Sequence, residues 1–102
     1  MARVIRKYDC HGGLEVEYFE LNKKKEGISN GYHDNSSLFS NVNYVNNRQH
    51  CRNFDFHRNG NIKLIINFEY GKINGEKKHF DINGILFAHY ICKDGIAIKT
   101  FM

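Results

Sequence analysis

Apolar and polar side chains alternate along most of this chain. The clearest run is 61–69, whose apolar residues at every second position are Ile62, Leu64, Ile66 and Phe68. Successive side chains of a strand point to opposite faces, so these four would share one face. Helical apolar spacing is absent, and glycine or asparagine interrupts every window of 15 residues. The pattern predicts an all-β protein.

The alternation repeats with a period of 24 residues. An aromatic residue recurs at Tyr8, Tyr32, Phe56 and Phe80, where we expect it to point into the core. Four residues later comes a turn position, at Gly12, Ser36, Gly60 and Gly84, and two further on an apolar residue. A fixed period of this length indicates tandem copies of one small unit that bury apolar surface against their neighbours.

Each unit divides into a long strand and a shorter return strand. The long strands are expected near 14–21, 38–45, 62–69 and 86–92. The return strands are expected near 27–33, 51–57, 76–81 and 96–101, and residues 3–9 match a return strand as well. Residues 70–75, with two glycines, read as the turn between two of them. Nine strands joined in sequence would form an elongated, twisted antiparallel meander sheet, roughly 40 Å across at ~4.8 Å per strand.

The length of 102 residues accommodates one domain. Its units would lie near 8–31, 32–55, 56–79 and 80–102, preceded by a half-unit at 1–7. Three cysteines without a signal-peptide h-region argue against a disulfide framework, and no stretch approaches 18 apolar residues. We therefore expect a reduced, cytoplasmic protein.

The region from Phe56 to Leu86 resembles MORN-type repeats, and more narrowly the variant repeat of bacterial antitoxin-component proteins. The matching positions are Asn59, Gly60, Phe68, Gly71, Lys72, Gly75 and Phe80. The resemblance covers nearly the whole chain and is clearest over 56–95; Ser36, Asn47 and Lys23 stand where glycines belong. It implies a stack of hairpins that acts as a scaffold or binding surface, and the repeat motif includes no catalytic residues.

Histidines and cysteines are the candidates for a metal site or a nucleophile. Neighbours in a strand point to opposite faces, so the pairs Cys10–His11 and His50–Cys51 chelate poorly, and no zinc-ligand spacing occurs. A reactive Cys51 would need a base that reaches its sulfur in space, which sequence adjacency does not provide. Glu15 and Glu17 share a face, but the repeat offers no cleft around them. We predict no catalytic residue, no metal and no cofactor.

Apolar residues also fall on the second face of the predicted sheet. The candidates for partner binding are Phe19, Phe39, Ile65, Phe87 and Ile91. A single-layer sheet packs only one face easily, so these residues indicate either a curled core or a surface for a protein partner or a second copy. The sequence favours a non-catalytic protein-binding module, antitoxin-like or scaffolding, with a rim of basic residues.

The net charge of +4 leaves a second hypothesis open. Positive side chains are scattered, and the only run, Lys23 to Lys25, reads as a solvated turn. The basic residues of the rim are Lys23, Lys24, Lys25, Arg52, Lys77 and Lys78. A surface of this kind would bind anionic lipid or nucleic acid with an affinity that falls steeply with salt. The same charge would steer the protein poorly toward a basic nuclease toxin.

Overall fold

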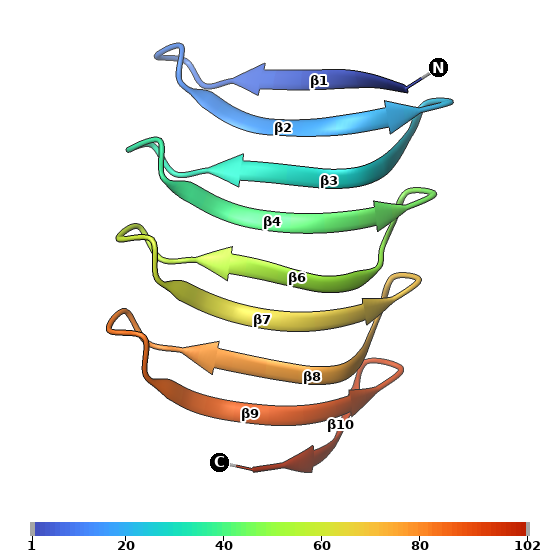
Figure 1. Ribbon diagram of the computed structural model, residues 1–102, viewed down its shortest axis with the longest axis vertical. Helices are drawn as coiled ribbons and strands as arrows, with labels where there is room; N and C mark the ends of the chain where they lie inside the picture. Colours follow the sequence, from blue (N-terminus) through green and yellow to red (C-terminus); the bar gives the residue numbers. More distant parts are fainter. Residues whose placement is uncertain (1, 102) are drawn as a thin grey trace.

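The strands follow the 24-residue period, and the sheet follows the order of the chain. The computed structural model describes residues 2–101, in which ten strands form one antiparallel sheet (Figure 1). The strands are β1 (Ala2–Tyr8), β2 (Leu14–Leu21), β3 (Lys24–Tyr32), β4 (Leu38–Val45), β5 (Arg48–Gln49), β6 (Cys51–Phe56), β7 (Ile62–Glu69), β8 (Lys72–Phe80), β9 (Leu86–Lys93) and β10 (Ile96–Thr100). The predicted all-β meander of hairpins is confirmed.

The molecule is a slab one sheet thick. Its principal extents are 41 × 31 × 15 Å, and the longest runs across the strands, from β1 to β10 (Figure 1). A second packed sheet would add about 10 Å of thickness, which the shortest extent does not accommodate. The expected width of roughly 40 Å for nine strands abreast at ~4.8 Å agrees with the long axis.

Five-residue loops line one edge of the slab. They begin at Asp9, His33, His57 and Asp81, and in each the amide of the fourth residue donates to the carbonyl of the first at 2.9–3.1 Å. The fourth residue is the predicted turn position, and its φ is positive in every unit, from 69° at Ser36 to 93° at Gly60. This is a type I turn followed by a left-handed residue, a common hairpin connection.

Two-residue turns line the other edge. Their central pairs are Asn22-Lys23, Asn46-Asn47, Tyr70-Gly71 and Asp94-Gly95, and both residues of every pair have positive φ, as in a type I′ turn. The predicted turn over 70–75 is therefore too long, and the return strands β3 and β8 begin earlier than expected, at Lys24 and Lys72. A type I′ turn matches the twist of its strands, so pairing resumes directly after it.

Residues 2–101 form ten strands rather than nine because one return strand is broken in two. Cys51 lies at the repeat position of Gly27 and Gly75, where all three residues have positive φ. In β3 and β8 the glycine is accommodated as a β-bulge within a continuous strand. In the middle unit the strand stops at Gln49 and resumes at Cys51, which separates β5 from β6.

The two faces of the sheet differ in burial. We call the packed face the side that carries the five buried residues with a side chain among residues 3–101: Ser29, Asn53, Ile66, Ala88 and Cys92. The opposite side, with Phe19, Asn41 and Ile65, is the open face. Cys92 is a core residue as predicted. Tyr8 is not a core residue, because its strand β1 has a neighbour on one side only and leaves the residue 59% exposed.

Candidate functional site

Of the five residues predicted to bind a partner, Phe19, Ile65 and Ile91 lie on the open face. Phe39 and Phe87 instead stand at β-bulges, beside Gly31 and His79 of the packed face. Phe19 is on β2, Phe39 on β4, Ile65 on β7, and Phe87 and Ile91 are on β9. The three phenylalanines are exposed and the two isoleucines are half-buried. Six strand spacings of ~4.8 Å, or roughly 29 Å, separate the strands of Phe19 and Phe87. The predicted site is therefore spread over both faces and across the width of the sheet.

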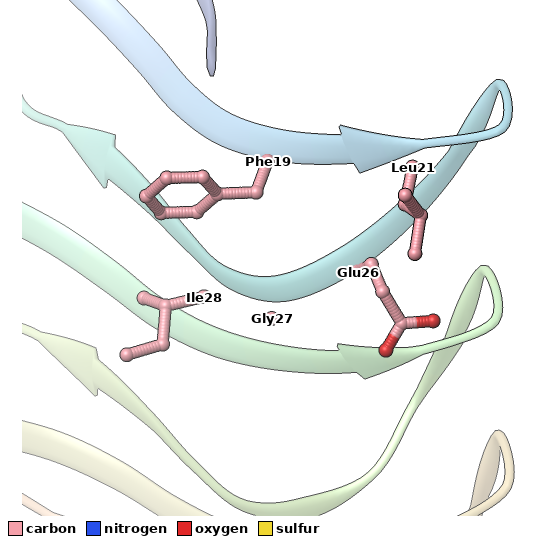
Figure 2. A pocket seen from close by; sticks show the side chains of 5 residues that line it. All are labelled: Phe19, Leu21, Glu26, Gly27 and Ile28. Atoms are coloured by element: carbon pink, nitrogen blue, oxygen red, sulfur yellow. The ribbon is translucent and has the colours of Figure 1, made fainter. Parts of the chain in front are cut away.

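An apolar hollow surrounds Phe19 at the β1 end of the open face. It has a volume of about 450 Å³ and is lined by Phe19, Leu21, Glu26, Gly27 and Ile28 (Figure 2). Val4 on β1 lies directly opposite Phe19 in the register. The four large apolar side chains of this group are 36% to 43% exposed. They form a continuous apolar surface over three neighbouring strands, which is the main candidate site.

A β-bulge in β3 creates the hollow. The register passes from Glu20 opposite Lys25 to Tyr18 opposite Ser29, so residues 26–28 stand across from Phe19 alone. Gly27, at the centre of the bulge, has φ of 83°, and no atom lies within 4 Å of where its Cβ would be. The extra residues spread the side chains of β3 away from those of β2, and Gly27 adds no side chain of its own.

Glu26 gives the hollow one fixed polar side. Its Oε1 accepts a hydrogen bond from the backbone amide of Asn46 at 2.7 Å, which anchors the carboxylate to the next two-residue turn. Glu26 is the sole charged residue in the lining, so its remaining acceptor capacity is the polar contact that the site offers. The predicted return strand begins at residue 27 and contains no bulge, so Glu26, Gly27 and Ile28 are not among the residues predicted to bind a partner.

The six basic residues predicted as a rim are distributed over both faces. Lys23 lies in a turn, Lys24 pairs with Leu21 on the open face, and Lys25 is on the packed face. The Nζ of Lys25 lies 4.9 Å and 5.0 Å from the ring centroids of Tyr18 and Tyr44. The prediction of a solvated turn is therefore wrong for Lys25, whose ammonium makes two cation–π contacts.

The other three predicted cations lie on β6 and β8. Arg52 pairs with Asn67 on the open face. Lys77 lies on the packed face, opposite Ile66 and Tyr90. Lys78 returns to the open face, where its Nζ is 3.0 Å from Glu76 Oε2. The structure does not bring these residues together with Lys23 and Lys24.

The candidates for metal binding and nucleophilic chemistry have other contacts. His50 Nδ1 accepts a hydrogen bond from the amide of Tyr70 at 3.2 Å, and its ring lies against that of Tyr70. The Nε2 atoms of His33 and His57 lie 2.9 Å from the carbonyls of Phe56 and Phe80. Within residues 2–101 no three metal-ligating side chains cluster. Glu17 forms an ion pair with Arg6 at 2.7 Å, so it does not act with Glu15 as a pair of carboxylates.

No protein-family model, curated protein or solved structure matches this chain. Across residues 2–101 no helix has the length and apolar character needed to cross a membrane.

Proposed function

We propose that this protein is a non-catalytic binding module of MORN-like hairpin repeats that uses the apolar hollow to hold a protein partner. The observation that carries the proposal is the continuous surface of Val4, Phe19, Leu21 and Ile28, which is exposed on three adjacent strands. Contiguous apolar surface on a folded protein is a usual mark of an interaction site. An apolar side chain of the partner would enter the hollow as an anchor.

The sheet holds these side chains in place before a partner arrives. They stand on paired strands and not on loops, and Glu26 is fixed by its bond to the Asn46 amide. A preorganised surface loses little conformational entropy on binding, so more of the contact energy appears as affinity. Most of that affinity should come from the few residues that seal the anchor from water.

The cations beside the hollow, in contrast to Glu26 within it, favour a partner that is acidic around its apolar anchor. Lys23 and Lys24 are exposed beside it, and the whole chain carries +4. Complementary charge speeds encounter and excludes basic competitors. The proposed role is therefore to scaffold an acidic protein, or to neutralise one as an antitoxin-like inhibitor.

Capture from lysate of the native host tests the proposal when it is combined with matched variants. The tagged full-length chain is compared with the double variant Phe19→Ser/Ile28→Ser and with Phe87→Ser, which removes a phenylalanine at the other end that is 58% exposed, against 42% for Phe19. We expect a stoichiometric protein that is retained at high salt by the parent chain and by Phe87→Ser. The double variant should bind that protein at least about thirtyfold more weakly, as loss of a hot spot of ~2 kcal/mol implies.

Two outcomes contradict the proposal. Equal weakening by Phe19→Ser/Ile28→Ser and by Phe87→Ser would show that the hollow is not the site. Nucleic acid or anionic lipid retained only at low salt, and released by Lys23→Gln/Lys24→Gln, would replace protein binding with the electrostatic alternative.

A further inference from the structure

A second hollow lies on the packed face, at the opposite end of the sheet from the candidate site. It is formed by β8, β9 and β10 and has a volume of about 210 Å³. Its apolar surface comes from Ile73, Cys92, Gly95 and Ala97. Its polar groups are the side chains of Lys77, His79 and Tyr90. Neither the fold nor the proposed function accounts for this combination.

The preceding repeat unit shows what normally occupies this place. One period earlier, the positions of Cys92 and Ala97 hold Phe68 and Ile73, which are much larger. The position of Lys77 holds Asn53, which is 2% exposed and bonds to the Asn43 amide and the Cys51 carbonyl. Around this hollow, two large side chains are thus replaced by small ones and a satisfied amide by a cation.

The polar groups of the hollow have no partners elsewhere in the sheet. Lys77 lies directly opposite Tyr90, and the rings of Tyr90 and His79 meet edge to face at 6.1 Å. Within residues 2–101 neither the Lys77 ammonium nor the Tyr90 hydroxyl makes a hydrogen bond or ion pair, whereas the neighbouring Lys78 pairs with Glu76. Burial, and then the charge of Lys77, lower the pKa of His79. The hollow therefore carries uncompensated positive charge beside apolar surface.

We propose that this hollow binds a small organic carboxylate. The carboxylate group would accept hydrogen bonds from the Lys77 ammonium and the Tyr90 hydroxyl, and the apolar body would lie against Ile73, Cys92 and Ala97. A volume of about 210 Å³ is below the ~300 Å³ at which pockets for drug-sized ligands begin, so the ligand has one ring or a short chain. This site lies on the opposite face from the partner surface. Failure of one proposal therefore leaves the other unaffected.

Titration of the isotope-labelled full-length chain with benzoate tests the site by NMR. Benzoate should cause saturable shifts of the amides of His79, Tyr90 and Cys92, with none around Phe19. Benzamide has the same shape without the charge and should bind roughly tenfold to a hundredfold more weakly, since it loses a hydrogen bond between charged groups. Absence of saturable shifts with benzoate, or equal affinity for benzamide, would overturn the proposal.

Three variants separate a built site from general attraction of anions to a basic protein. Lys77→Gln should weaken benzoate binding at least about tenfold. Lys93→Gln removes the same charge from the exposed end of β9 and should leave the affinity unchanged. Cys92→Phe restores the residue type of the preceding unit and should abolish binding while the sheet stays folded. Equal loss in Lys77→Gln and Lys93→Gln, or undiminished binding in Cys92→Phe, would contradict the proposal.

Discussion

Cys51 adopts a backbone conformation for which the units on either side use glycine. Its φ is 66°, against 83° at Gly27 and 98° at Gly75. A side chain in this left-handed region costs roughly 1–2 kcal/mol, because the Cβ approaches the following carbonyl. Its thiol is exposed. The residue is therefore a local source of strain, and the break between β5 and β6 occurs beside it.

Cys51→Gly should stabilise the protein. It relieves the left-handed strain but gains backbone freedom in the unfolded chain, so the net increase in unfolding free energy should be roughly 0.5–1 kcal/mol. Urea denaturation measures it. Cys51→Ala is the matched control and should bring no gain, because alanine carries the same Cβ. A glycine variant no more stable than the alanine variant would contradict this explanation.

Asp55 is a second residue that works against stability at neutral pH. Burial raises its pKa above the ordinary value of 3.8, and Lys63 only partly offsets this. A raised pKa in the folded state means that ionisation opposes folding. Its favourable contribution is complete below pH 3.8 and is lost as the pH rises through the folded pKa.

Asp55→Asn should therefore raise the urea midpoint at pH 7. Its advantage should shrink as the pH falls through the raised pKa of Asp55 and be absent below pH 3.8. Unfolding curves measured across this pH range test the prediction. The control is Asp94→Asn in an exposed two-residue turn, which should change the midpoint little at any pH. An advantage of Asp55→Asn that persists at low pH would point to packing rather than charge.

Among the elements, the five-residue loops are linked from one unit to the next by side chains. His33 and His57 reach the carbonyls of Phe56 and Phe80, and Asn59 Nδ2 donates to the Ile82 carbonyl at 2.9 Å. In the first and last loops an aspartate replaces the histidine and accepts hydrogen bonds within its own loop. The histidines are thus connections between units.

His57→Ala should destabilise the protein by roughly 0.5–1.5 kcal/mol, the usual contribution of one hydrogen bond. The corresponding change His11→Ala is the control, because this exposed side chain makes no hydrogen bond within residues 2–101. Equilibrium urea unfolding compares the two. Equal losses of unfolding free energy would show that the hydrogen bond between His57 and the Phe80 carbonyl does not stabilise the protein.

Much of the fold could be predicted from the chain, and the candidate hollow could not. Alternation fixed the long strands, since β7 occupies the expected residues 62–69, and glycines marked the loop positions. The starts of β3 and β8 were missed because Asn22-Lys23 and Tyr70-Gly71 only weakly resemble type I′ turns in sequence. The hollow depends on the bulge at Gly27, and one glycine in a strand does not distinguish a bulge from a turn.

At the scale of the whole molecule, each unit touches only its neighbours, so units should be removable. Deletion of residues 56–79 joins Asp55 to Phe80 in place of Phe56 and brings the Phe80 carbonyl to His33. The sheet should refold with its long axis shortened by about 10 Å, two strand spacings, and with a smaller dependence of stability on urea. Solution scattering and urea unfolding measure both effects.

Deletion of residues 56–67 is the control for this experiment. It removes half a period, so the strand that follows would run in the wrong direction and the sheet should not form. A 24-residue deletion that unfolds as completely as the 12-residue one would show that the units are not interchangeable.

The slab shape also determines how the molecule yields to force. β1 and β10 lie at opposite ends of the long axis, and every strand runs across it (Figure 1). A pull between these ends acts along the inter-strand hydrogen bonds, so they are loaded one ladder at a time and the sheet unzips from an edge. Each unit would release roughly 80 Å of chain, at ~3.4 Å per residue. We therefore expect the sheet to unfold at low force and in steps of equal length, one repeat unit at a time.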